Sequence, residues 1–194
     1  MFSPGDQRIL LDLAAAAIGR ALKAGEPIPI DPSAFPESLR QDRACFVTLK
    51  IRERLRGCIG SIEAYRPLVS DVADNAYKAA FRDPRFPALR EEEFRVASLS
   101  LSILTQPELF PVESEEDLIR RMHPGRDGLI IEEGTRRGTF LPSVWEDLGN
   151  PREFLRELKQ KAGLPADYWS GTLRFLRYTA ETIERDSIGG VPSG

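Results

Sequence analysis

Residues 44–61 read ACFVTLKIRERLRGCIGS, and this stretch predicts the centre of the fold. Over residues 44–51 the side chains alternate in the manner of a half-buried β-strand. The charged residues 52–54 supply a turn, and residues 55–61 form a second strand. The sequence therefore predicts a β-hairpin whose second strand carries LRGCIG.

The LRGCIG segment places one of only two cysteines two positions after an arginine. Because successive side chains of a strand point to opposite faces, we expect Arg56 and Cys58 to share one face and Leu55 and Ile59 the other. A nearby guanidinium favours the thiolate form of a cysteine. Cys58 is therefore a candidate catalytic residue and Arg56 a candidate binding residue. The alternative is that Cys58 is a small buried apolar residue, as most free cysteines are.

Two glycines flank this cysteine. Gly57 and Gly60 remove side-chain bulk, so backbone or a ligand can approach closely, and both are candidate binding residues. The second cysteine, Cys45, begins an apolar strand and is expected to be structural.

A second candidate segment is Asp83-Pro84-Arg85-Phe86-Pro87. Two prolines stiffen a loop that holds a carboxylate, a guanidinium and an aromatic ring. In one interpretation Asp83 pairs with Arg85 or caps a turn, while Phe86 fills the core. In the other, the rigid loop presents Arg85 to an anion such as a carboxylate or phosphate. Both interpretations remain open from the sequence.

His123 is the single histidine of the chain, and the proline after it predicts an extended backbone near a turn. It is most simply a surface or structural residue. A pair of Cys58 as nucleophile and His123 as base requires that the two side chains lie close together in space. Ser98, Ser100 and Ser102 alternate with apolar residues, which indicates the wetter face of a sheet.

The remaining pattern mixes helices and strands with several hairpin-like connections. This arrangement predicts an α+β fold with a mainly antiparallel sheet flanked by helices. We expect one domain over residues 1–186, which leaves open a small subdomain within it, and a flexible tail over residues 187–194. The predicted helices are 7–24, 67–81, 114–122, 143–148 and 151–162, and the predicted strands are 44–51, 55–61, 96–104, 128–133, 138–141 and 172–178.

Composition excludes several classes of protein. The chain has 194 residues, a net charge of -3 and a pI near 5.4, and an acidic chain is a poor binder of nucleic acid. One histidine and two cysteines rule out a disulfide framework and the common zinc sites, and no cofactor motif is evident. No apolar run is long enough to span a membrane and no signal peptide is visible. We therefore expect a reduced, cytoplasmic protein.

Seven segments in order resemble the AMMECR-one family, whose microbial members are also called AmmeMemoRadiSam system protein A. The resemblance extends from about residue 5 to about residue 185, and LRGCIG is the hallmark of the family. The segments are CFVTL, LRGCIGSIE, AFRDPRFPAL, LSILTQPELF, DGLIIEE, GTFLPSVW and FLRELKQKAGLPADYW.

This resemblance implies an antiparallel sheet with helices around it, a smaller lobe and a cleft near the hallmark hairpin. Position by position, Phe86 fits the DPRF segment and Glu108 fits the segment after the serine strand, and both join the binding candidates. The family name implies an association with Memo-like and radical-SAM proteins, and roles in nucleic-acid metabolism have been suggested for the family. Ser143 stands where glutamine is commoner, which weakens any role that needs an amide there.

Three functions follow from these observations. The first is an enzyme or enzyme subunit acting on a small anionic molecule, with Cys58 as nucleophile or covalent anchor. In it Arg56 and Arg85 are anion clamps, and Asp83 is an orienting or proton-accepting group. The second is a non-catalytic partner of Memo-like or radical-SAM proteins. The third, binding of RNA or DNA, is disfavoured by the acidic pI.

Overall fold

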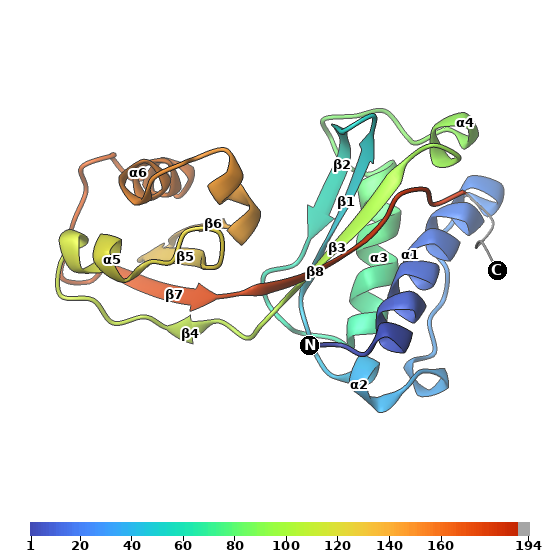
Figure 1. Ribbon diagram of the computed structural model, residues 1–194, viewed down its shortest axis with the longest axis horizontal. Helices are drawn as coiled ribbons and strands as arrows, with labels where there is room; N and C mark the ends of the chain where they lie inside the picture. Colours follow the sequence, from blue (N-terminus) through green and yellow to red (C-terminus); the bar gives the residue numbers. More distant parts are fainter. Residues whose placement is uncertain (190–194) are drawn as a thin grey trace. The chain divides into compact units, whose positions relative to one another are not determined.

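The computed structural model describes residues 1–189, which fold into two compact units (Figure 1). Unit 1 contains residues 1–104 together with the described residues from Glu181 onward, and unit 2 contains residues 105–180. Unit 1 is therefore completed by the last strand of the described residues. Within residues 1–189, no helix combines the length and the apolar character needed to cross a membrane.

Unit 1 is a four-stranded sheet with the long helices α1 and α3 on one face (Figure 1). Its elements are α1 (Pro4–Ala24), η1 (Pro32–Ala34), α2 (Glu37–Arg40), β1 (Cys45–Ile51), β2 (Arg54–Gly60), α3 (Leu68–Phe81), α4 (Glu91–Phe94), β3 (Ser98–Leu104) and β8 (Ala180–Arg185). The strand order is β2-β1-β3-β8, and β1 pairs antiparallel with β2 and β3. The strand β2 therefore lies at an edge of this sheet.

The core of unit 1 forms where α1 and α3 pack on the sheet. Alternate residues of β1 and β3 are buried there, namely Cys45, Val47, Leu49, Leu99, Leu101 and Ile103. The helix α1 begins at Ser3, whose side chain accepts a hydrogen bond from the Asp6 N–H, and ends at Gly25 in a left-handed conformation. The opposite face of the sheet carries Ser98, Ser100 and Ser102, and we call it the serine face.

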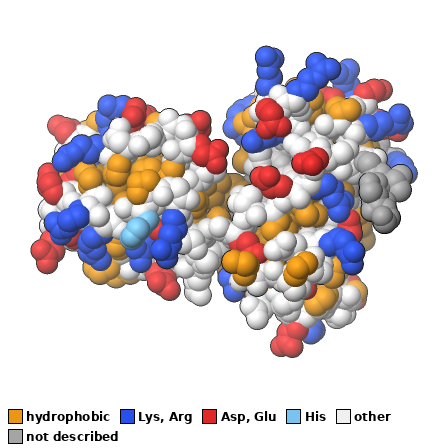
Figure 2. Space-filling model, viewed as in Figure 1, with side chains coloured by type: hydrophobic (Ala, Val, Ile, Leu, Met, Phe, Trp, Pro, Cys, Tyr) orange, Lys and Arg blue, Asp and Glu red, His pale blue; other side chains and the backbone are white. Residues whose placement is uncertain are grey.

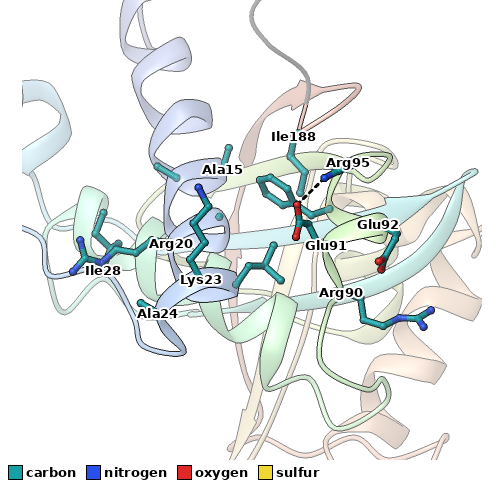
Figure 3. A pocket seen from close by; sticks show the side chains of 15 residues that line it. Ala15, Arg20, Lys23, Ala24, Ile28, Arg90, Glu91, Glu92, Arg95 and Ile188 are labelled. Atoms are coloured by element: carbon teal, nitrogen blue, oxygen red, sulfur yellow. Dashed lines mark hydrogen bonds and ion pairs between the residues drawn. The ribbon is translucent and has the colours of Figure 1, made fainter.

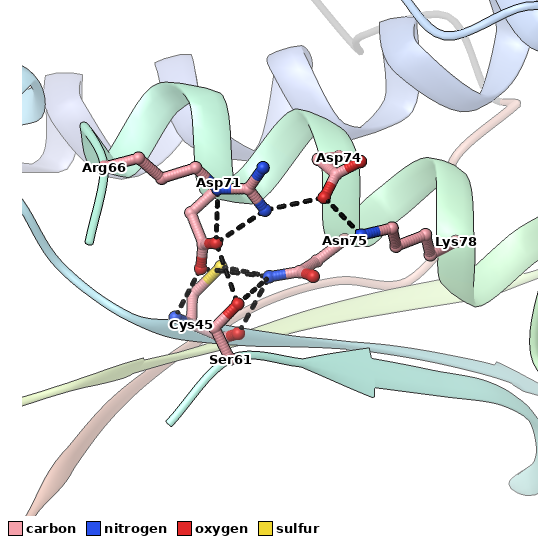
Figure 4. Close-up of polar contacts among 7 residues, drawn as sticks. All are labelled: Cys45, Ser61, Arg66, Asp71, Asp74, Asn75 and Lys78. Atoms are coloured by element: carbon pink, nitrogen blue, oxygen red, sulfur yellow. Dashed lines mark hydrogen bonds and ion pairs between the residues drawn. The ribbon is translucent and has the colours of Figure 1, made fainter. Parts of the chain in front are cut away.

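A buried polar cluster joins α3 to the ends of β1 and β2 (Figure 4). The Asp71 carboxylate, 1% exposed, accepts hydrogen bonds from the Cys45 N–H and the Asn75 amide, each at 2.9 Å. It also accepts from the Ser61 hydroxyl at 2.9 Å and from Arg66 Nε at 2.8 Å. Since a buried charge is tolerated only when it is fully paired, these four donors account for an aspartate inside the core.

Unit 2 contains the second four-stranded antiparallel sheet, with the order β4-β7-β5-β6. Its elements are β4 (Glu108–Leu109), α5 (Glu115–Arg121), β5 (Gly128–Glu133), β6 (Arg136–Phe140), η2 (Pro142–Glu146), α6 (Pro151–Lys161) and β7 (Arg174–Tyr178). In its core the rings of Trp145 and Phe154 stack with centroids 3.9 Å apart. A left-handed Gly134 closes the β5–β6 hairpin.

The predicted α+β class is confirmed, and so is the hairpin around LRGCIG. Several details of the fold differ from the sequence-based expectation, among them the short elements η1, α2, α4 and β4, which were not predicted. The strands divide between two sheets, and the strand β8 was not predicted, because Ile183 is its one buried apolar side chain. Of the tail predicted from residue 187, Ser187 and Ile188 are held by hydrogen bonds to Arg95 O and Ala97 O. Residues 190–194 lie outside the described part of the chain.

Candidate functional site

The Cys58 side chain lies on the serine face of unit 1. Cys58 pairs with Thr48 across β1 and β2, and Thr48 pairs with Ser100 across β1 and β3. Residues directly opposite one another in an antiparallel sheet share a face. The Thr48 hydroxyl donates to Cys58 Sγ at 3.4 Å, and the cysteine is partly exposed. The thiol is thus oriented by a hydroxyl rather than enclosed in hydrocarbon.

Arg56 does not share this face with Cys58, so that prediction was wrong. The register of β1 and β2 shifts between Leu49 and Lys50, which makes Arg56 an extra residue in a β-bulge and pairs Leu55 with Lys50. Leu55 therefore takes the face expected for Arg56. Beyond a bulge, the side chains of a strand point to the opposite faces from those that simple alternation predicts. The sequence around Arg56 and Gly57 gives little local sign of a bulge.

The Arg56 guanidinium is buried and is bonded inside unit 1. Its Nε and Nη2 donate to the two carboxylate oxygens of Glu93 at 2.9 and 3.0 Å, and Nη2 also donates to Pro87 O. This bond to Arg56 is the main cause that lowers the pKa of Glu93. Nη1 is buried without a hydrogen-bond partner among residues 1–189. Most of this guanidinium is therefore committed to holding the 87–93 segment against β2.

The loop that contains Asp83 and Arg85 covers the exposed edge of β2 at Cys58. The Cys58 N–H donates to Asp83 Oδ2 at 2.9 Å, and Arg85 Nη2 donates to the Cys58 carbonyl at 3.1 Å. Arg85 also binds Asp83 through Nε and Nη2, at 2.9 and 2.7 Å. Two side chains thus take the place of a neighbouring strand at this residue.

Electrostatics follow from this arrangement. The hydrogen bond from Arg85, together with those from the backbone, holds the pKa of the Asp83 carboxyl far below its usual range. A carboxylate that resists protonation is a weak base, so the geometry favours the orienting role over the proton-accepting role. The same bond to Asp83 raises the pKa of Arg85, and the nearby Cys58 sulfur contributes to that rise.

The glycines and the aromatic ring of the two segments have packing roles. A Cβ on Gly57 would lie 2.1 Å from the carbonyl oxygen of Ala79 in α3, and one on Gly60 would lie 2.3 Å from the Phe46 ring. The Phe86 ring lies 5.8 Å from Arg56 Cζ and 5.6 Å from Arg85 Cζ. Cation–π contacts of this kind help to order both guanidiniums. The close approach expected of Gly57 and Gly60 is thus made by the protein itself, and their role toward a ligand stays a prediction.

Unit 1 carries a small polar hollow and a large groove. The smaller, about 80 Å³, is polar. Its lining includes three hydroxyl residues, two cations and three acids, namely Thr48, Ser98, Ser100, Lys50, Arg185, Glu53, Glu184 and Asp186. It adjoins Cys58 through Thr48. The larger, about 1160 Å³, is a mainly apolar groove between α1 and the 90–95 segment (Figure 3). No residue of LRGCIG or of the 83–87 loop lines either hollow, and the smaller one is linked to Cys58 only through Thr48.

The other predicted site residues belong to unit 2. His123 is exposed and lies beside the buried Asp127, with Nδ1 at 3.4 Å from Asp127 Oδ2. Glu108 is exposed on β4, opposite Arg177 of β7. The pair of Cys58 and His123 remains a prediction, since the two residues belong to different units.

Cys45 is fully buried, and burial raises the pKa of its thiol well above the usual value. This agrees with a structural role. Within residues 1–189, no three His, Cys, Asp or Glu side chains are grouped so as to hold a metal ion.

Sequence reasoning missed Glu93, Asp71 and Asn75. Asp71 and Asn75 are spaced i, i+4 on the otherwise apolar buried face of α3, and that interruption was the available signal. No local pattern marks Glu93 as the partner of Arg56, because it lies in a run of three glutamates.

Together these features define an α+β protein of two compact units in which a partly exposed thiol is fixed at a sheet edge by an aspartate and an arginine. The AMMECR1 family pattern matches residues 11–183, and the chain belongs to this family, the one that its seven ordered segments resemble. No activity follows from membership alone.

The chain is similar in sequence to other proteins over nearly its whole length. The chain is 38% identical over 186 residues to a protein of Methanothermobacter thermautotrophicus, covering 95% of this chain and 96% of that one. It is 39% identical over 174 residues to Protein MJ0810 of Methanocaldococcus jannaschii, covering 88% and 86%. The crystal structure of uncharacterized protein PH0010 from Pyrococcus horikoshii is similar, with a TM-score of 0.85 and 37% identity, covering 94% and 93%.

Proposed function

We propose that unit 1 binds a small anionic molecule beside Cys58 and that the thiol is the group that reacts with it. The observation that carries this proposal is the position of Arg85. Its guanidinium is bonded to the carbonyl of Cys58 itself, yet about half of the side chain (53%) is exposed. A fixed guanidinium with free surface is suited to bind a carboxylate or phosphate.

The neighbouring groups support distinct roles. Asp83 keeps Arg85 in place and holds the backbone of Cys58, so it is a positioning residue. Thr48 orients the sulfur, and the hydroxyls of Ser98 and Ser100 line the adjoining hollow, where they offer hydrogen bonds to a polar molecule. Both cysteines are free thiols, which suits a reducing compartment, and we place this activity in the cytoplasm.

The experiment compares two alkylating reagents of similar size and opposite electrostatics. Iodoacetate is an anion and iodoacetamide is neutral, and both report on Cys58 because Cys45 is buried. If Arg85 attracts anions to the thiol, the rate with iodoacetate divided by the rate with iodoacetamide falls about fivefold in Arg85→Gln, because one nearby positive charge is lost. The ratio cancels any general change in thiol accessibility that the substitution causes.

Arg54→Gln is the matched control, since it removes an exposed positive charge from the same hairpin. Its ratio should equal that of the unchanged protein. A Cys58 thiol that is inert toward both reagents in the folded protein sinks the proposal, as does an unchanged ratio in Arg85→Gln.

A second candidate is an accessory protein that docks to a Memo-like or radical-SAM protein. The apolar groove beside α1 favours it, because Ala16, Leu22, Ile28 and Phe94 line a large hollow on the surface (Figure 3). Ala16→Glu places a charge in the groove, whereas Arg8→Gln changes the net charge equally on an exposed part of α1. Loss of complex formation with a purified candidate partner in Ala16→Glu alone supports docking; equal retention in both variants contradicts it.

A further inference from the structure

The single histidine of the chain is held by a buried carboxylate in unit 2. Both the His123 N–H and the His123 Nδ1 lie near Asp127 Oδ2, at 3.0 and 3.4 Å. Asp127 is 1% exposed, whereas the His123 side chain is 59% exposed. A carboxylate at Nδ1 fixes the ring orientation and leaves Nε2 toward solvent.

An arginine with unused donors lies beside this pair. Arg177 Nη1 is 3.9 Å from Asp127 Oδ2, and its Cζ is 4.5 Å from the centroid of the Phe110 ring. Arg121 contacts the same ring at 4.8 Å. Within the described residues, the Arg177 side chain donates no hydrogen bond. It is therefore held in place by the ring and a long ion pair while its N–H groups remain available to a ligand.

In this region of unit 2 two negative charges are buried and most of the positive charges lie at the surface. The two carboxylates, Asp117 and Asp127, are buried, while the cationic groups that surround them reach the surface. Figure 2 shows the histidine bordered by Lys and Arg side chains on this face of unit 2. Glu108, directly opposite Arg177 in the sheet, is an exposed acid on the same face as Arg177. The surface that a solute meets is therefore mainly positive, although the buried acids offset the total charge.

We propose that His123 and Arg177 form a binding site for a small oxyanion of the phosphate class, with Arg121 as a flanking positive charge. Arg177 offers a fork of N–H donors that matches two oxygens of such an anion, and His123 lies close to it because both side chains approach the same oxygen, Asp127 Oδ2. Asp127 and Phe110 are positioning residues that keep the two side chains in register. This inference concerns unit 2 and is independent of the function proposed for unit 1.

The test uses the full chain and inorganic phosphate as the probe. Because His123 is the single histidine, its ring protons give one identifiable pair of NMR signals. At constant ionic strength, we expect phosphate to shift these signals saturably in the millimolar range.

Arg177→Gln should raise the dissociation constant about tenfold or more, from the loss of charge-assisted bonds. Arg174→Gln is the matched control. It removes the same charge from the same strand but points to the other face, and should change the constant less than about twofold. Glu108→Gln leaves the core untouched and should tighten binding, because it removes a repelling charge.

The proposal is overturned if phosphate produces no saturable shift of the His123 signals. It is also overturned if Arg174→Gln weakens binding as much as Arg177→Gln, which would indicate general attraction to a positive surface. Should Arg177→Gln not fold, Glu108→Gln decides: tighter binding supports the site, and unchanged or weaker binding contradicts it.

Discussion

The backbone N–H of Cys58 donates a hydrogen bond of 2.9 Å to the carboxylate of Asp83. An edge strand exposes unpaired backbone groups, and at Cys58 both are taken by side chains of one short loop, the carbonyl by Arg85. The hallmark strand β2 and the 83–87 loop therefore stabilise each other at Cys58. This contact places a guanidinium beside the sulfur while it protects the edge of the sheet.

Asp83→Asn should lower the free energy of unfolding by about 2 kcal/mol at neutral pH, because charge-assisted hydrogen bonds are lost. The folded pKa of Asp83 lies well below the value of 3.8 for an ordinary aspartate. The carboxylate therefore contributes its full stability above that value and loses it as the pH falls toward the folded pKa. Urea unfolding at a series of pH values should show the difference from the unchanged protein narrowing below about pH 4.

Glu92→Gln serves as the control for this experiment, since it removes an exposed acid of α4. It should change the stability by less than about 0.5 kcal/mol. A gap between Asp83→Asn and the unchanged protein that is constant down to pH 2–3 would contradict the assigned ion pair.

Gly57→Ala should destabilise unit 1 by about 3 kcal/mol or more, because the added Cβ would lie 2.1 Å from Ala79 O in α3. Either β2 or α3 must move to admit it. Gly149→Ala is the matched control, since nothing lies within 4 Å of its Cβ position. Thermal unfolding measures both, and similar midpoints for the two variants would show that α3 does not need this close approach.

The two thiols should differ in reactivity. A chromogenic thiol reagent should titrate one group rapidly in the folded protein and the second only after denaturation, because Cys45 is fully buried and Cys58 is partly exposed. Cys58→Ser should abolish the fast phase, and Cys45→Ser should retain it. If the fast phase survives in Cys58→Ser, the rapidly reacting thiol is not Cys58 and the prediction is wrong.

Lys159 is fully buried in unit 2, with Nζ 2.6 Å from Glu115 Oε2. Glu115→Gln should cost about 3 kcal/mol, because it leaves a buried ammonium without its carboxylate. Lys159→Met should be within about 1 kcal/mol of the unchanged protein, since Glu115 is partly exposed and can be hydrated. Chemical unfolding compares them with Glu116→Gln, an exposed neighbour; equal stability of the two glutamate variants would rule out a strong buried pair.

Local patterns anticipated much of this protein. Alternation over residues 44–61 predicted the hairpin, and the i, i+3, i+4 spacing of apolar residues predicted α1 and α3. These features depend on residues a few positions apart, because strand alternation and helix periodicity are properties of the backbone conformation itself. For the same reason Ser98, Ser100 and Ser102 were correctly assigned to the wetter face.

Contacts between distant segments were settled in three dimensions. Arg56 meets Glu93, which is 37 positions away, and Cys58 meets Asp83, which is 25 positions away. The bulge at Arg56 and the pairing of β3 with β8 arise in the same way. Each of these contacts depends on which polar groups lack a hydrogen-bond partner once the chain is folded. Such a group can bond to any suitable group nearby in space, whatever its distance along the sequence. Composition and periodicity therefore specify the elements, whereas the arrangement of charges around the sulfur is decided by packing.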